Sequence, residues 1–227
     1  MFRSWQRELT QVGVHAVQLP GRGWRFREKP YTRVRDLAVA ACDGLRPHLG
    51  QPFALFGHSL GALVAFEIAR ELRRQRGPEP FHLFVSARRG PRRPDPASPM
   101  HGMPDARLLA EVRSRYGGIP EAVVQEPELL ALLLPALRSD LEAVETYFCA
   151  PEPPLDVPIS AFGGMSDPWA SLDDLEAWRD ETNGPFSVTR FPGGHFYLEE
   201  SEAPLLEELG SQLARTGAVR ASLAANP

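Results

Sequence analysis

This sequence of 227 residues has few cysteines, no long apolar run and no excess of positive charge. The two cysteines, Cys42 and Cys149, lie far apart and outside any C-x-x-C pattern, which argues against a disulfide framework or a zinc site. The longest apolar run, residues 129–137, is too short to cross a bilayer and contains Pro135. A net charge of −4 argues against nucleic acid as a partner. We therefore expect a cytoplasmic protein with no membrane span and no metal site.

What is present is an alternation of strands and helices. Alternation of this kind predicts an α/β fold with a mostly parallel sheet flanked by helices, and the length suits a single domain, residues 1–227. The last residues, from Arg215 to Pro227, are expected to be a frayed tail. Strands are predicted at 12–19, 53–57, 81–86, 159–163 and 186–191, and helices at 2–9, 32–49, 60–75, 171–178 and 201–213.

The alternation stops between Ser86 and Ile159. A stretch rich in proline and arginine comes first, followed by helical patterns at 105–116 and 128–148. These helices lie between two strands of the sheet, so they form a predicted insertion over about residues 92–155. The apolar side chains of Leu129, Leu133 and Leu137 share one face. They either pack on the main core or form the underside of a lid over an apolar substrate.

Residues 53–69 read as a strand, a G-x-S-x-G turn and a helix. A strand that turns directly into a helix strains the backbone of the middle residue, Ser59, and exposes its side chain at the top of the sheet. Because Gly57 and Gly61 have no Cβ, the strand and the helix can pass close to each other. The N–H of Leu60 points to where an oxyanion would form. The pentapeptide also occurs by chance, but its strand–turn–helix context favours Ser59 as a nucleophile.

A serine nucleophile needs a base, and the base needs an orienting carboxylate. Only His195 lies on a glycine-rich loop directly after the last strand, at the same sheet edge as Ser59, whereas the ring of His58 is expected to point away from the serine. Asp167 follows the strand at 159–163 by one tight turn. The remaining candidates are explained otherwise or placed less well: His15, His48, His82 and His101 among the histidines, Asp95, Asp173 and Asp174 among the acids.

The order of serine, aspartate and histidine along the chain is that of α/β-hydrolases, and we expect that fold. The chain also resembles the type II thioesterases, the external editing enzymes of polyketide and nonribosomal peptide assembly lines. The resemblance rests on residues 17–22, 53–66 with Gly-His-Ser-Leu-Gly, 86–89, 129–147, 167–168 and 191–196.

The resemblance implies hydrolysis of acyl thioesters on the phosphopantetheine arm of an acyl or peptidyl carrier protein. The substrate brings the arm, so no cofactor of the enzyme is implied, and a monomer is expected. Carried over, Ser59 is the nucleophile, Asp167 the orienting acid and His195 the base. The rival hypotheses are another α/β-hydrolase esterase or peptidase, and a catalytically impaired protein that binds carriers.

The start of the chain departs from the family pattern. Relatives begin with a strand and a Pro-His-Ala-Gly-Gly type of loop, which supplies a second oxyanion donor besides Leu60. Met1 falls just after that loop. We expect the missing strand to lie between the strands at 12–19 and 53–57, and its absence to lower both activity and stability.

A basic run follows the strand at 81–86. Arg88, Arg89, Arg92 and Arg93 start at a strand end and enter the insertion, so they are expected near the mouth of the site. Arginine suits phosphate and carboxylate groups, which makes the run a candidate docking site for an acidic carrier protein. The alternative is an ordinary solvated loop.

Overall fold

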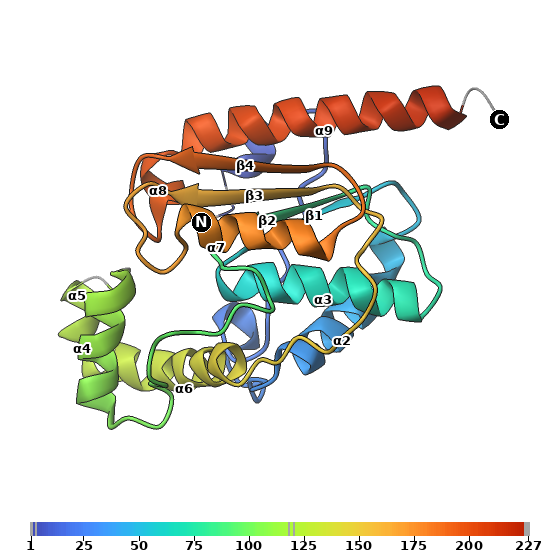
Figure 1. Ribbon diagram of the computed structural model, residues 1–227. Helices are drawn as coiled ribbons and strands as arrows, with labels where there is room; N and C mark the ends of the chain where they lie inside the picture. Colours follow the sequence, from blue (N-terminus) through green and yellow to red (C-terminus); the bar gives the residue numbers. More distant parts are fainter. Residues whose placement is uncertain (1, 3, 118, 120, 225–227) are drawn as a thin grey trace.

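The structure is a computed structural model that describes residues 2, 4–117, 119 and 121–224, with side chains through residue 216. Four parallel strands form one sheet in the order β1-β2-β3-β4 (Figure 1). This confirms the predicted α/β class with a parallel sheet. The strands are Ala54–His58 (β1), His82–Ser86 (β2), Ile159–Gly164 (β3) and Phe186–Phe191 (β4).

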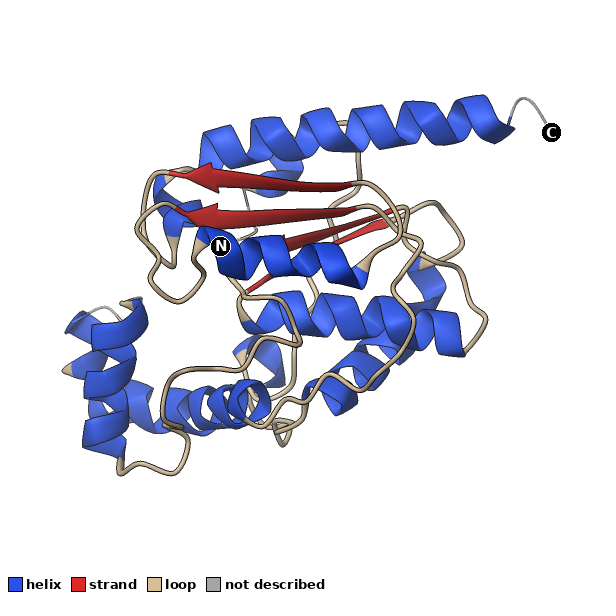
Figure 2. Cartoon of the chain, in the orientation of Figure 1, coloured by secondary structure: helices blue, strands red, loops and turns tan. Residues whose placement is uncertain are grey.

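Helices cover both faces of this sheet (Figure 2). The helices α2 and α3 lie on one face, and α9 lies across the other. The α-helices are Trp5–Glu8 (α1), Val34–Leu45 (α2), Leu60–Arg74 (α3), Asp105–Tyr116 (α4), Glu121–Val124 (α5), Pro127–Glu145 (α6), Leu172–Glu176 (α7), Tyr197–Glu200 (α8) and Glu202–Ala224 (α9). Short 3₁₀ turns occupy Gly23–Arg25 (η1), Arg46–His48 (η2) and Ala177–Glu181 (η3).

The two faces of the sheet carry two separate cores. Strand side chains alternate between faces, so Leu83 and Val85 of β2 join the cluster beneath α2 and α3. Phe84, between them, joins the cluster beneath α1, α8 and α9. All five residues of β2 are buried, as expected for a parallel strand covered on both sides.

The segment 12–19 is not a strand, which corrects the prediction. It runs without a ladder partner among the described residues, and β1 is an edge of the sheet. Two of its backbone groups are held by a side chain instead: Val14 N–H donates to Gln6 Oε1 (2.7 Å), and Gln6 Nε2 donates to the carbonyl of Val12 (3.2 Å). Alternating apolar residues alone could not form a strand here because a strand requires a neighbour.

The insertion is present as α4, α5 and α6 between β2 and β3. It has a small core of its own, in which Leu141 of α6 packs with Leu108 and Val112 of α4. Leu129, which the pattern placed on the same face, is 49% exposed. The apolar stripe is therefore divided between the insertion's own core and its surface. Pro135 lies inside α6, which continues through it.

The C-terminal prediction needs correction as well. α9 continues as a helix to Ala224 instead of fraying from Arg215, and residues 225–227 lie outside the described part of the chain. Among the described residues, no helix combines the length and the apolar character needed to span a bilayer. Within the same part of the chain, no group of histidine, cysteine and acidic side chains is arranged to hold a metal ion.

Candidate active site

Ser59 occupies a strained turn between β1 and α3. Its φ of 54° and ψ of −117° lie outside the usual regions for a residue with a side chain. The strain persists because the turn is held: Ser59 N–H donates to the Ser86 carbonyl on the next strand (2.8 Å). This is the backbone predicted for the G-x-S-x-G turn.

The two glycines of the turn are not equivalent. A Cβ on Gly57 would lie 1.9 Å from the carbonyl oxygen of Gly61, so the close approach of strand and helix excludes any larger residue. A Cβ on Gly61 would meet nothing within 4 Å. The steric requirement predicted for both glycines therefore holds for Gly57 alone.

The side chains of Ser59, His195 and Asp167 form a continuous hydrogen-bonded chain. His195 Nε2 lies 3.0 Å from Ser59 Oγ, and His195 Nδ1 lies 2.8 Å from Asp167 Oδ2. The carboxylate of Asp167 is fully buried, and its other oxygen accepts from the Trp169 N–H at 2.9 Å. The structure thus brings together three residues that are up to 136 positions apart in the sequence.

The loops that carry the acid and the base are locked against each other. Ser166 N–H donates to the Gly193 carbonyl (2.9 Å), and a Cβ on Gly164 would lie 2.2 Å from the carbonyl oxygen of Gly194. This close approach fixes the distance between Asp167 and His195 through the backbone.

Leu60 is the first residue of α3, so its N–H has no acceptor inside the helix. The positive end of a helix dipole and a free N–H next to Ser59 favour negative charge at this point. The arrangement suits stabilisation of an oxyanion.

His58, Ser86 and Tyr197 form a second hydrogen-bonded chain beside the first. His58 Nδ1 lies 2.9 Å from Ser86 Oγ, which lies 2.7 Å from the Tyr197 hydroxyl. The His58 ring lies beside that of His195, with centroids 5.3 Å apart, and its Nε2 is buried without a partner. Burial, and secondly the charge of His195, lower the pKa of His58 to about 3. The ring therefore stays neutral next to the base.

Sequence reasoning missed Ser86 and Tyr197. Ser86 is the last residue of β2, and Tyr197 is the first residue of α8, directly after the loop of His195. Their contact could not be predicted because they are 111 positions apart.

The insertion reaches the site through Tyr116, the last residue of α4. Its ring centroid lies 4.8 Å from that of His195 and 5.9 Å from that of Trp169. Trp169 Nε1 donates to the carbonyl of Arg115 (2.7 Å), which ties the end of α4 to the loop of Asp167. Tyr116 was also missed by sequence reasoning.

The other histidines are engaged elsewhere. His101 Nδ1 lies 2.6 Å from a Glu145 carboxylate oxygen within the insertion. His82 bonds to Ser160 and Thr216, and the rings of His15 and His48 lie 4.6 Å apart. Among the rejected acids, Asp174 forms the capping box of α7 with Ser171, as its spacing predicted.

The four arginines of the basic run do not form one patch. Arg89 is buried, and it donates to the carbonyls of Pro94 (2.9 Å) and Trp169 (3.1 Å). Arg88 is largely buried, 3.8 Å from the carboxylate of Asp95, and burial lowers its pKa.

Arg92 pairs with Glu181 at 2.8 Å, and Glu181 lies before the amino end of β4. Catalytic loops leave the carboxyl ends of the strands, so Arg92 lies at the opposite end of the sheet. This corrects the expected position of Arg92 near the mouth of the site, whereas Arg89 does lie beside the loop of Asp167. Arg93 is exposed beside Arg92, in a hollow of about 510 Å³ that also contains Asp173, Glu176 and Asp180.

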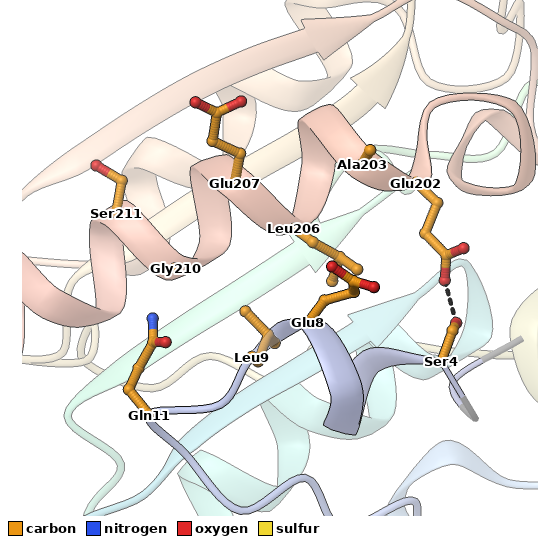
Figure 3. Close-up of a pocket in the computed structure, with 10 residues that line it drawn as sticks. All are labelled: Ser4, Glu8, Leu9, Gln11, Glu202, Ala203, Leu206, Glu207, Gly210 and Ser211. Carbon is orange, nitrogen blue, oxygen red and sulfur yellow. Dashed lines mark hydrogen bonds between the residues drawn. The ribbon is translucent and has the colours of Figure 1, made fainter.

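A groove of about 500 Å³ lies between the N-terminal segment and α9 (Figure 3). The residues on its two sides are joined by a hydrogen bond from the Ser4 hydroxyl to the carboxylate of Glu202. None of the three residues of the Ser59–His195–Asp167 chain lines it. The hydrogen-bonded chain of Ser59, His195 and Asp167 is therefore separate from this groove.

A serine, a histidine and a buried carboxylate in this geometry, at the carboxyl edge of a parallel sheet, define the chain as a serine hydrolase with an α/β-hydrolase-like fold. The family model for thioesterase domains matches residues 1–213. The chain belongs to this thioesterase family, as a type II thioesterase.

The chain is similar to individual proteins over most of their length. RedJ, a thioesterase of the prodiginine pathway in Streptomyces coelicolor, superposes with a TM-score of 0.86 at 43% identity, over 93% of this chain and 80% of RedJ. The type II thioesterase BorB of the borrelidin cluster has a TM-score of 0.79 at 41% identity, over 87% of this chain and 80% of BorB. Linear gramicidin dehydrogenase LgrE of Brevibacillus parabrevis is 42% identical over 94% of this chain and 82% of LgrE.

LgrE bears the name of a dehydrogenase. The present sequence contains no G-x-G-x-x-G fingerprint of a dinucleotide site. The family model and both solved structures are those of thioesterases, which agrees with the hydrolytic geometry around Ser59.

Proposed function

We propose that the chain hydrolyses acyl thioesters carried on the phosphopantetheine arm of an acyl or peptidyl carrier protein, as an editing enzyme of polyketide or nonribosomal peptide synthesis. The observation that carries the chemistry is the unbroken chain from Ser59 Oγ through His195 to the buried carboxylate of Asp167. The similarity to thioesterases of such pathways supports the thioester substrate.

In this proposal Ser59 Oγ attacks the thioester carbonyl carbon while His195 Nε2 accepts the hydroxyl proton. Asp167 holds His195 in the required tautomer and stabilises the imidazolium. The negative charge on the carbonyl oxygen is received at the N–H of Leu60. When the C–S bond breaks, His195 returns the proton to the departing sulfur and the acyl group stays on Ser59.

Water then completes the cycle. His195 takes a proton from a water molecule as that water attacks the acyl carbon. When the bond between the acyl carbon and Ser59 Oγ breaks, His195 returns the proton to Ser59 Oγ and the free acid is released. The neutral ring of His58 suits this step, because a second cation beside the His195 imidazolium would oppose its formation.

The insertion, about residues 92–155, is proposed to act as a lid. The contact of Tyr116 with His195 supports this role, because it places the end of α4 over the catalytic base. A lid in this position would exclude water from the acyl group until transfer is complete.

The direct test uses a purified acyl carrier substrate and the Ser59→Ala variant. Removing the nucleophile is expected to lower kcat by about 10⁴-fold or more and leave the fold intact. Mass spectrometry of the parent during turnover should find the acyl group on Ser59. Turnover retained by Ser59→Ala would refute the mechanism.

Two controls address the rival functions. Faster hydrolysis of a simple oxygen ester than of the carrier thioester would favour a general esterase. Tight binding of the acyl carrier without turnover would favour a carrier-binding protein.

A further inference from the structure

The segment from Arg22 to Arg35 is strongly basic in an acidic chain. It has six cationic side chains against the single carboxylate of Glu28, a net charge of +5. Because the whole chain has a net charge of −4, the other 213 residues carry −9. The net charge of the rest of the chain would repel an acidic partner, and this segment would attract it.

Much of this charge is free and exposed. Arg22 pairs with Asp140, and Arg25 pairs with Glu28. Arg27, Lys29 and Arg33 are exposed, and none pairs with a carboxylate among the described residues. By contrast, the neighbouring cations Arg70, Arg73 and Arg74 of α3 all pair with glutamates.

Large aromatic side chains accompany the free cations. Trp24 is 78% exposed, Phe26 52% and Tyr31 39%. The Arg27 guanidinium lies over the Phe26 ring, 5.4 Å from its centroid. Aromatic residues and arginine are enriched in protein interfaces and supply most of their binding energy. Their exposure together indicates a protein-binding surface.

Arg22, the first residue of the segment, is fixed to the insertion. Both Arg22 Nη atoms donate to the Asp140 carboxylate, at 2.6 and 2.7 Å. The turn is closed by the Gly21 N–H, which donates to the carbonyl of Arg25 (3.0 Å). A surface held in this way loses little conformational entropy when a partner binds.

Its anchor also places the segment beside the proposed lid. Asp140 lies on α6, which packs against α3, the helix that starts directly after Ser59 (Figure 1). A protein docked on this segment would therefore lie next to the insertion.

We propose that residues 24–33, with Trp24, Phe26, Arg27, Lys29 and Arg33 as its contacts, form the docking surface for an acidic face of the carrier protein. The identity of the partner rests on the proposed function. The surface replaces the 88–93 run as the docking site, because in that run Arg89 and Arg92 are already occupied.

The test compares two charge-reversal variants of equal charge. In the Arg27→Glu/Lys29→Glu variant the surface is altered. In the control, Arg7→Glu/Arg76→Glu, two exposed cations without a carboxylate partner are reversed, on α1 and beyond the far end of α3. The surface variant should raise KM for the acyl carrier substrate about tenfold, with the effect shrinking at high salt. The control should leave it unchanged.

A small acyl thioester separates docking from chemistry. Its kcat/KM should be the same in both variants and the parent. Equal KM changes in the surface variant and the control, or equal losses with both substrates, would overturn the docking proposal. An inactive parent would count against the proposed function instead.

Binding can be measured without turnover. In a Ser59→Ala background, the surface variant should bind the acyl carrier more weakly by the same factor. If it binds as well as the parent, the proposal fails. If it loses affinity for phosphatidylglycerol vesicles and not for the carrier, the surface serves a membrane and the proposal is overturned.

Lys29 is the only lysine of the chain, which allows a positional check. Carbodiimide coupling should join the Lys29 amine to a carboxylate of the carrier protein. The Lys29→Arg variant keeps the charge and should lose this cross-link without a change in KM. A cross-link of equal yield in Lys29→Arg would show that the carrier docks elsewhere.

Discussion

Two histidines at opposite ends of the sheet each bond to a serine of the next strand, with different consequences. At the carboxyl end, His58 of β1 bonds to Ser86 of β2 at 2.9 Å. At the amino end, His82 of β2 bonds to Ser160 of β3, also at 2.9 Å. Burial is the main cause that lowers the pKa of both, to about 3 and about 4 respectively.

The difference lies in what surrounds each pair. Both ring nitrogens of His82 are satisfied, the second by the Thr216 hydroxyl (3.1 Å), and Ser160 also bonds to Gln212 of α9. This pair ties the sheet to α9. His58 has one nitrogen without a partner and lies against His195. The same pair ties the sheet to a helix at one end and lies beside the proposed catalytic base at the other, because parallel strands place their connecting loops at the carboxyl ends.

The strongest test of this division is Asp167→Asn. The amide would favour the wrong tautomer of His195, and kcat should fall by roughly 10⁴-fold. The matched control is Asp174→Asn, which alters the capping box of α7 and should cost about 1 kcal/mol of stability with little change in kcat. Steady-state kinetics and urea unfolding separate the two effects. If Asp174→Asn or Asp95→Asn were the damaging change, the acid would be misassigned.

A smaller effect is expected from replacing the serine that bonds to each histidine, Ser86 at the carboxyl end and Ser160 at the amino end. Ser86→Ala leaves His58 and Tyr197 without partners next to His195, and kcat should fall about tenfold. Ser160→Ala removes the equivalent hydroxyl at the far end and should lower the free energy of unfolding by about 1–3 kcal/mol while kcat is kept.

Tyr197→Phe keeps the ring and removes only the hydroxyl that bonds to Ser86, so it should reproduce part of the kcat loss without the fold being disturbed. Unchanged kcat in both Ser86→Ala and Tyr197→Phe would mean that the carboxyl-end pair is as purely structural as the other.

The third prediction concerns acid stability. The pKa of His82 is about 4 when folded and about 6.5 when unfolded, so the unfolded chain binds the proton more readily. The contribution of His82 to the free energy of unfolding is constant above pH 6.5. As the pH falls from 6.5 towards 4, protonation of the unfolded chain lowers that free energy. At pH 5 the cost is about 2 kcal/mol.

His82→Gln should therefore reduce the difference in unfolding free energy between pH 8 and pH 5 by about this amount, whatever its stability at pH 8. Urea unfolding at both pH values measures it. An unchanged difference would show that His82 does not carry the acid sensitivity.

The sequence by itself determined the features that a few neighbouring residues encode. The G-x-S-x-G turn forces a strained Ser59, the glycine pair before His195 forms a loop after a strand, and Ser171 with Asp174 forms a capping box. Each depends on local backbone chemistry. The order of strands then brings Ser59, Asp167 and His195 to one edge, because parallel strands end at the same side of a sheet.

Only the tertiary structure decided which distant groups meet. The pattern at 12–19 is that of a strand, yet it has no ladder partner among the described residues. The basic run at 88–93 looks like a docking patch, yet Arg92 is held by Glu181, 89 positions away. Ser86 and Tyr197 carry no signal of their contact. A side chain's partner depends on how the whole chain closes, and no short segment contains that information.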